Sequence, residues 1–328
     1  MKKIKQIIIT LLTVAILPLN TFAYSDYIIA SGENIGIELN SKGIIIVGTY
    51  DVDGSSPAKK ANLQQGDKII KINDKEVNTI EEMMEIINEN NNIEEIKITY
   101  LRGSKVNTTN LEMKKDENDV YKTGLYIKDN ITGIGTLTFI DPKTKLYGAL
   151  GHEIVEKNTG QKLEIKDGKI YSSTVTGITP SDEYNPGEKN ARYDSTDIHG
   201  YVKENTTSGI FGEYTSEIKD IKKYKVATYK DIKLKEAKIL TVLEDNKVEG
   251  FNINILKVSD ESNSTKNILF EVTDKKLLEK AGGIVQGMSG SPIVQGEYII
   301  GAVTHVVVDD PKKGYGILIT TMLEEAEN

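Results

Sequence analysis

Residues Ile134–Ile140 (IGTLTFI), Asp141–Thr144 (DPKT) and Leu146–Leu150 (LYGAL) are the stretch that decides the fold class. Ile, Thr and aromatic residues favour strands and Asp-Pro favours a turn, so the stretch predicts two strands joined by a tight connection. From Gly124 to the C-terminus, similar short runs are separated by Gly, Asn, Asp and Pro at intervals of roughly ten residues. This pattern predicts an all-β sandwich or barrel, with one short helix at Lys275–Lys280.

A histidine directly follows the second of these strands. The chain has three histidines, His152, His199 and His305. His152 comes after Leu150 and Gly151, so we expect its imidazole at a strand end, where a general base is anchored and accessible. A zinc site is not expected, because the sequence from His152 begins like H-E-x-x-H but has Glu156 in place of the second histidine. We predict a general base here, and no metal or cofactor.

A serine suited to nucleophilic attack lies in Gly287–Pro292 (GMSGSP). Glycines near Ser289 permit a tightly turned main chain, in which a hydroxyl is exposed and backbone N–H groups can face an oxyanion. A Gly/Ser/Pro cluster is by itself more often a simple turn, so this interpretation depends on His152 as partner. The segments Pro292–Val294 and Tyr298–His305 then predict a hairpin that turns at residues 295–297.

Composition limits the class of partner. The chain has 328 residues, 38% hydrophobic and 27% charged, which is ordinary for a soluble globular protein with room for two domains. Its 41 basic and 49 acidic residues give a net charge of -8, which argues against a nucleic-acid partner. Cysteine is absent, so disulfides, thiolate metal sites and a cysteine nucleophile are excluded.

The first 23 residues are predicted to be an export segment. Lys2, Lys3 and Lys5 precede a largely apolar run from Ile7 to Leu19, which ends shortly before Ala23. The run is shorter than the ~20 residues of a comfortable membrane-spanning helix. This favours a cleaved signal peptide over a retained N-terminal membrane anchor, and both alternatives stay open.

Residues 24–115 are predicted to form a small α+β domain. A charged bridge, Asp116–Asp119, separates it from the β-rich part at residues 116–328. Thr79 is a predicted N-cap, and Glu82 completes a capping box for a helix over Ile80–Asn88. The other predicted elements are a short helix from Ser56 and strands at 35–39, 43–48, 69–73, 96–100 and 110–113.

The pattern Ala61-x-Leu63-x-x-Gly66-Asp67-x-Ile69-x-x-Ile72-Asn73 resembles a PDZ domain in its bacterial arrangement. The resemblance implies that a peptide C-terminus adds as a strand beside a carboxylate-binding loop. That loop would be formed by Asn34, Ile35, Gly36 and Ile37. The apolar pocket would be lined by Met83, Met84 and Ile87, which could equally be core residues of the helix.

The whole chain resembles the stage IV sporulation protein B family of serine peptidases. The resemblance rests on segments in the family's order, namely Gly124–Ile127, Gly133–Thr136, Gly148–Ile154, Pro186–Lys189, Gly209–Gly212 and Gly282–Pro292. It implies a PDZ domain followed by a trypsin-like double β-barrel peptidase. It also implies export into the space between the two forespore membranes. There the peptidase would cleave itself and a regulatory membrane-protein complex, as a signal to late gene expression in the mother cell.

The same resemblance implies roles for residues of the site. Ser289 would be the nucleophile and His152 the general base, with the N–H groups of Gly287 and Ser289 binding the oxyanion. Asp274 matches the family's assigned triad aspartate, whereas the order of groups in trypsin-like enzymes favours Asp197.

Met288 stands immediately before the nucleophile, where trypsin has an aspartate that pairs with a new N-terminus. That activation is therefore excluded. We expect control to come from elsewhere, and the PDZ domain is our hypothesis.

Two alternatives remain open on the sequence alone. The chain could be a PDZ-bearing scaffold that binds proteins without cutting them. It could also be a serine/lysine peptidase, in which Lys275 or Lys280 would be the base.

Overall fold

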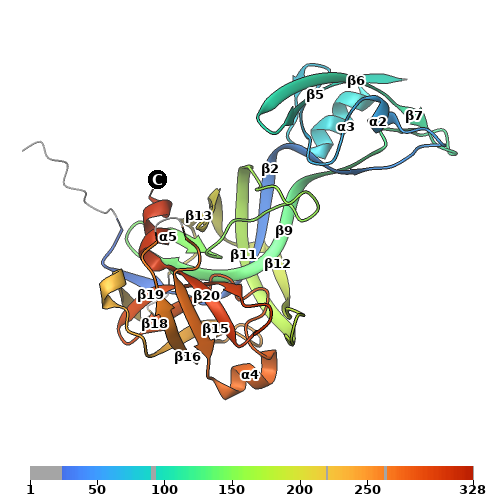
Figure 1. Ribbon diagram of the computed structural model, residues 1–328. Helices are drawn as coiled ribbons and strands as arrows, with labels where there is room; N and C mark the ends of the chain where they lie inside the picture. The colour runs from blue at the N-terminus through green and yellow to red at the C-terminus, as the bar shows by residue number, and fades with distance from the viewer. Residues whose placement is uncertain (1–23, 90–93, 219–220, 262–263, 328) are drawn as a thin grey trace, which may run out of the picture.

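The structure is a computed structural model, and it describes residues 24–89, 94–218, 221–261 and 264–327. The predicted export segment at 1–23 lies outside these residues. Strands make up most of the described chain, which forms two lobes (Figure 1). Among the described helices, none has the length and apolar character needed to cross a membrane.

The smaller lobe is the α+β domain. Thr79 accepts a hydrogen bond from the Glu82 N–H, and Glu82 accepts from the Thr79 N–H, which confirms the predicted capping box. Met83 and Ile86 on the inner face of this helix pack with Ile44, Ile69 and other buried residues of the strands. The elements are the second half of β2 (Asn34–Thr49), α2 (Pro57–Lys60), β3 (Lys68–Ile72), β4 (Lys75–Glu76), α3 (Ile80–Asn88), β5 (Glu95–Arg102) and β6 (Lys105–Glu112).

The larger lobe contains two closed barrels, each formed by a cycle of paired strands. In the first barrel, β2 pairs with β9, and the cycle continues through β10, β13, β12 and β11 back to β2. The bounds are β9 (Leu125–Ile140), β10 (Leu146–Ala149), β11 (Ile165–Thr179), β12 (Glu188–Thr206) and β13 (Gly209–Tyr214). Its interior is filled by residues such as Ile37, Leu137, Tyr147 and Ile170.

The second barrel follows in sequence. Here β15 pairs with β16, and the cycle continues through β17, β20, β19 and β18 back to β15. The bounds are β15 (Glu236–Val242), β16 (Val248–Val258), β17 (Ile268–Val272), β18 (Pro292–Gln295), β19 (Tyr298–Val306) and β20 (Lys313–Leu318). Phe251, Phe270 and Met288 lie in its core. The predicted mainly β class, with a double β-barrel after the small domain, is confirmed.

Short elements join or cover the barrels. β1 (Tyr27–Ala30) pairs with β9 and with β14 (Lys223–Val226), and β14 pairs with β19 of the second barrel. Helix α4 (Lys275–Ala281) confirms the predicted helix, whereas the buried face of α5 (Ile319–Ala326) had not been predicted. The remaining elements are β7 (Lys114–Lys115), β8 (Tyr121–Lys122) and a 3₁₀ turn at Tyr229–Asp231.

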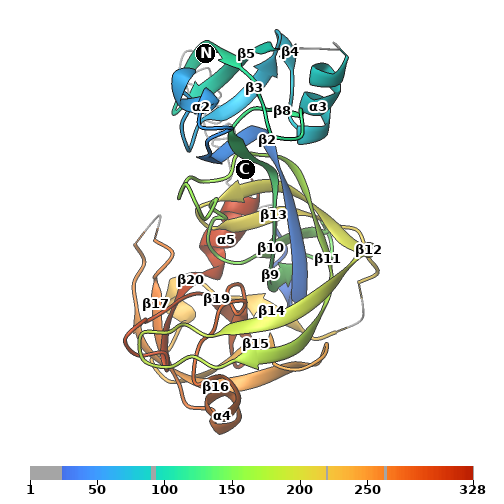
Figure 2. The same cartoon turned by 90° about the vertical axis from the view of Figure 1, so that its right-hand side faces the viewer.

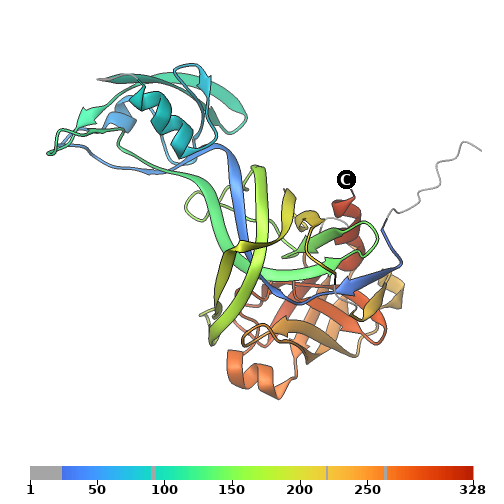
Figure 3. The ribbon, with the colours of Figure 1, turned by 180° about the vertical axis from the view of Figure 1, so that it is seen from behind.

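The strand β2 overturns one prediction. Two strands were expected at 35–39 and 43–48, but β2 runs through both and passes from the first barrel into the small lobe beside β9 (Figure 3). Asn34, Ile35, Gly36 and Ile37 pair with β9 on one edge, and Ile35–Ile37 pair with β11 on the other. Their backbone groups are used inside a barrel, so the prediction that they form the carboxylate-binding loop is wrong. Residues 24–115 had been assigned to the PDZ domain, and the pairing puts 27–41 in the sheet of the larger lobe.

Candidate active site

Ser289 lies on a loop of the second barrel, residues 285–291, which we call the nucleophile loop. The loop is clamped against the first barrel by β9. The Thr136 N–H donates to the Ser289 carbonyl at 3.0 Å, and the Thr136 hydroxyl donates to the Gly287 carbonyl at 2.8 Å. On the other side, the Gly290 N–H donates to the Val303 carbonyl at 2.7 Å. The nucleophile is therefore fixed between the two barrels.

Two N–H groups of this loop have no partner in the described parts of the chain. The N–H groups of Gln286, Met288, Gly290 and Ser291 donate to backbone carbonyls. Within the described residues, those of Gly287 and Ser289 donate to no backbone or side-chain acceptor. An oxyanion hole requires two such free donors beside a nucleophile. The arrangement therefore suits the predicted oxyanion role of Gly287 and Ser289.

His152 comes from the first barrel. Leu150 and Gly151 both have left-handed backbone angles, with φ of 70° and 73°, and they turn the chain at the end of β10. Gly151 is needed in this turn because a Cβ there would lie 2.9 Å from Cγ2 of Thr304. The Nδ1 of His152 lies 2.8 Å from the Glu153 carbonyl oxygen. A carbonyl only accepts, so Nδ1 carries the proton and Nε2 is the basic nitrogen.

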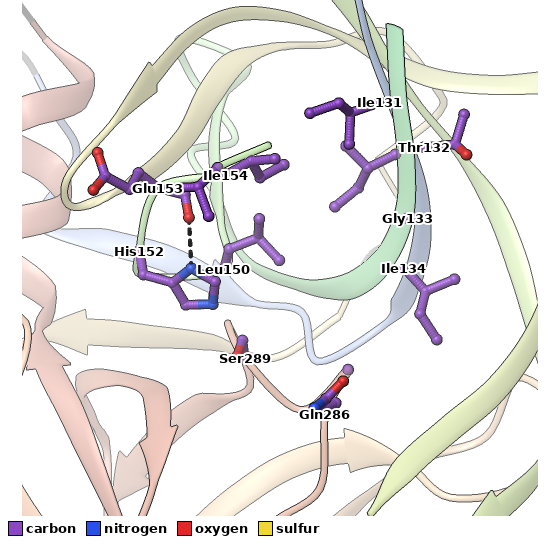
Figure 4. A pocket seen from close by; sticks show the side chains of 13 residues that line it. Ile131, Thr132, Gly133, Ile134, Leu150, His152, Glu153, Ile154, Gln286 and Ser289 are labelled. Carbon is purple, nitrogen blue, oxygen red and sulfur yellow. Dashed lines mark hydrogen bonds between the residues drawn. The ribbon is translucent and has the colours of Figure 1, made fainter. Parts of the chain in front are cut away.

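Ser289 and His152 line the same pocket (Figure 4). The Ser289 hydroxyl donates to the Thr304 carbonyl at 3.1 Å, and it makes no hydrogen bond with His152. A rotation of the Ser289 side chain is therefore needed before the imidazole can take its proton. In structures without a bound substrate, hydrogen bonds between a nucleophile and its base are often long or poorly aligned.

Neither predicted aspartate is brought to His152. Asp274 caps α4 by accepting from the N–H groups of Leu277 and Asn252, each at 3.2 Å. Figure 2 shows α4 at the end of the lobe opposite β10, which leads to His152. Asp197 lies 3.4 Å from Nε2 of His199 instead. In this structure neither Asp274 nor Asp197 bonds to His152, and the Glu153 carbonyl takes the orienting role.

A second histidine, His305, lies beside His152 at the site. Its ring centroid lies 5.5 Å from that of His152. Its Nδ1 is buried and has no partner among the described residues. Burial, and secondarily the neighbouring His152, lower the pKa of His305 to about 4. His305 is therefore neutral at neutral pH and adds no positive charge beside the general base. The sequence predicted His305 at the end of a hairpin strand, but its proximity to His152 comes from the packing of residues distant in the sequence.

The depressed pKa of His305 predicts a pH-dependent stability. The folded state binds this proton less tightly than the unfolded chain, so stability falls as the pH decreases from about 6.5 to about 4. His305→Gln removes the titration. Between pH 7 and pH 4, the free energy of unfolding should fall by on the order of 2 kcal/mol more in the wild type than in the variant. This figure allows for the partial exposure of the His305 side chain. Urea unfolding at the two pH values measures this difference, and equal losses would show that His305 does not titrate as described.

The pocket beside Ser289 has a volume of about 340 Å³. Apolar side chains of the first barrel form most of its wall. The polar residues that line it are Thr132, His152, Glu153, Gln286 and Ser289 (Figure 4). The apolar lining residues are Ile37, Ile131, Ile134, Leu150, Ile154 and Val155. Within the described parts of the chain, no group of three or more His, Cys, Asp or Glu side chains could hold a metal ion.

Comparisons with known proteins show which family the chain matches. Residues 119–323, more than half of the chain, match the family model described as SpoIVB peptidase S55. Residues 34–113 match the model of the PDZ domain. A comparison with curated proteins gave no match. Among solved structures, the PDZ domain of an SdrC-like protein from Listeria monocytogenes is 21% identical, with a TM-score of 0.23. The match covers 27% of this chain and 90% of that one.

Proposed function

The chain belongs to the SpoIVB peptidase S55 family and is a serine peptidase with a PDZ domain, and we propose that Ser289 and His152 perform its chemistry. One observation carries this proposal. A serine with two N–H groups beside it and an imidazole line one pocket and come from different barrels, and among the described residues neither the N–H groups nor Nε2 has a hydrogen-bond partner. The serine attacks the carbonyl carbon of a peptide bond, and the imidazole takes the hydroxyl proton.

Proton transfer through His152 completes the cycle. The imidazolium gives its proton to the leaving amine as the C–N bond breaks, which leaves an ester on Ser289. Water then gives a proton to Nε2 as it attacks the ester. The acid product leaves, and the imidazolium passes that proton to the Ser289 oxygen. The N–H groups of Gly287 and Ser289 stabilise the oxyanion in both steps. The Glu153 carbonyl holds Nδ1–H, which keeps Nε2 as the reacting nitrogen throughout.

The apolar pocket indicates which substrates are cleaved. The acyl half of a substrate extends along β19, since Ser289 contacts Thr304 there and β18 pairs with β19 only as far as Ala302. The pocket lies on the other side of Ser289, against β9 and the segment after His152. We therefore assign it to the side chain that follows the scissile bond, with a preference for apolar residues.

Ile134→Asp tests this assignment. A carboxylate in the pocket wall should lower kcat/KM about 10- to 100-fold for a peptide with Leu after the scissile bond. The substitution should lower kcat/KM much less for the same peptide with Lys after the scissile bond, because the new carboxylate attracts the lysine ammonium group. Measuring kcat/KM for both peptides separates the two effects. A uniform loss for Leu and Lys peptides would place the pocket outside the substrate path.

The family and the predicted export segment support a proposal for the biological setting. We propose that the chain is exported, acts between the forespore membranes, cleaves itself and cleaves a membrane-embedded regulatory complex during sporulation. The experiment is to incubate the purified wild type and its Ser289→Ala variant and to map new N-termini by mass spectrometry. New termini that appear only with Ser289 support self-cleavage. Identical termini in both samples would overturn it.

The PDZ domain is proposed to control this activity by binding a peptide C-terminus. Its contacts support this, because Gln65 donates to the Asn158 carbonyl at 2.6 Å and Lys68 pairs with Glu164. Asn158 and Glu164 lie in the segment that follows His152. A conformational change in the PDZ domain could therefore be transmitted to the catalytic lobe through these two contacts. With Asn34–Ile37 inside the barrel, the open edge for an added strand is residues 125–128 of β9, beside α3.

The two rival functions are separated by the same experiments. Lys275 and Lys280 lie on α4, and Lys280 pairs with Glu244, so the structure does not bring either lysine to Ser289. A serine/lysine mechanism would leave activity intact in His152→Ala. A non-catalytic scaffold would show no cleavage that depends on Ser289.

A further inference from the structure

A lysine is buried behind the nucleophile loop, and the reaction described above does not use it. Lys189 lies on β12 and is 3% exposed. Its Nζ donates to the Thr241 hydroxyl at 2.8 Å and approaches the Thr136 hydroxyl at 3.5 Å. Ser291 donates to the same Thr241 hydroxyl at 3.0 Å. We call Lys189, Thr136, Thr241 and Ser291 the buried polar cluster.

The cluster contains no counter-ion for the amine. Burial lowers the pKa of Lys189 to about 7, and no neighbouring charge contributes to the shift. Burying an amine without a carboxylate is costly, so such a group calls for a functional or structural reason. Both the neutral and the protonated amine can donate to two hydroxyls, and the contacts therefore do not depend on its charge.

The cluster holds the two peptide units that carry the oxyanion donors. In a trans peptide unit the C=O and N–H point in opposite directions, so holding one fixes the other. The Lys189 N–H donates to the Gln286 carbonyl at 2.9 Å, which directs the Gly287 N–H away from β12. The Ser291 N–H donates to the Met288 carbonyl at 2.9 Å, which directs the Ser289 N–H away from Ser291.

The Lys189 side chain also supports the loop directly. A Cβ added at Gly287 would lie 3.2 Å from Cβ of Lys189, so the lysine stem packs against the loop. The Thr136 hydroxyl lies next to the amine and donates to the Gly287 carbonyl. Met288 is fully buried in the apolar core and cannot supply a charge here.

We propose that Lys189 is the positioning residue of the oxyanion hole. Its buried amine holds the nucleophile loop in place, because the uncharged Met288 beside the nucleophile cannot hold the loop through an ion pair. The proposal rests on the proposed function, because it assigns the N–H groups of Gly287 and Ser289 to an oxyanion. Lys189 itself does not touch the substrate.

Lys189→Met tests the proposal, since methionine keeps most of the length and removes the amine. Losing the alignment of an oxyanion donor should lower kcat about 100- to 1,000-fold and change KM less than about threefold. Thr241→Val is a second, milder variant that removes the hydroxyl acceptor and should lower kcat in the same direction. Lys203 on the same strand is exposed and pairs with Glu213, so Lys203→Met is the matched control and should keep wild-type kcat.

Chemical rescue distinguishes the amine from simple packing. The chain has no cysteine, so Lys189→Cys creates a single thiol. Alkylation of the unfolded variant with 2-bromoethylamine, followed by refolding, rebuilds an amine of nearly the same length. Alkylation with bromoethane gives a similar but apolar side chain. We expect kcat to recover only with the amine.

Two results would overturn the proposal. One is a Lys189→Met kcat within about threefold of the wild type, and the other is equal rescue by both alkylating agents. These results differ from the result expected if the proposed function were wrong, since the wild type itself would then show no cleavage that depends on Ser289.

Discussion

Ser289→Ala is expected to lower kcat/KM by about 10⁴- to 10⁶-fold. The hydroxyl is the group that forms the ester, and no other hydroxyl lies beside the two free N–H groups of Gly287 and Ser289 in the described pocket. His152→Ala should cost a similar factor, because a serine without a base is a weak nucleophile. The double variant should be no worse than either single one, since the two groups act as a unit.

The measurement is hydrolysis of a short peptide, with protein concentration and folding matched by circular dichroism. Ser216→Ala is the control, because that hydroxyl donates to the Ile198 carbonyl and lies outside the pocket. Activity in Ser289→Ala above about a tenth of the wild type would exclude Ser289 as the nucleophile.

Gly290→Ala is expected to destabilise the chain by at least about 3 kcal/mol and to remove activity together with it. Gly290 has φ of 91°, and an added Cβ would lie 2.1 Å from the Thr136 carbonyl oxygen and 2.4 Å from the Leu150 nitrogen. Both atoms are backbone of the first barrel, so neither can move aside as a flexible side chain would. The loop must instead separate from β9, which breaks the contacts that place Ser289.

Gly296→Ala is the matched control. It also has a left-handed backbone, with φ of 62°, but nothing lies within 4 Å of an added Cβ. Its cost should be about 1 kcal/mol, with activity retained. Urea midpoints and peptide hydrolysis give both quantities. Similar losses for the two variants would mean that the close approach of the barrels at Gly290 is not required.

Local signals in the sequence predicted the elements that depend on few residues. The capping box of Thr79 and Glu82 and the helix at α4 need only near neighbours, and both are confirmed. The loop around Ser289 could also be predicted from its local sequence, because the left-handed backbone at residues 287 and 290 requires glycine. The short strand-forming runs separated by turn residues predicted a mainly β fold, but they did not predict which strands pair.

The errors come from contacts between distant residues. Nothing near Asn34–Ile37 shows that these residues pair with β9 and β11 rather than with a peptide. The burial of Lys189 depends on Thr136 and Thr241, which come from two other strands. The capping role of Asp274 is a local feature, since an aspartate directly before a helix is an N-cap signal that the sequence already contained.

The central claim is that Ser289 is a nucleophile activated by His152, and covalent trapping tests it most directly. The wild type and His152→Ala are incubated with diisopropyl fluorophosphate, and modified residues are located by mass spectrometry. The account predicts one phosphoryl adduct, on the Ser289 oxygen, in the wild type, and little or none in His152→Ala over the same time. An unmodified Ser289 in the wild type, or equal labelling of both proteins, would contradict it.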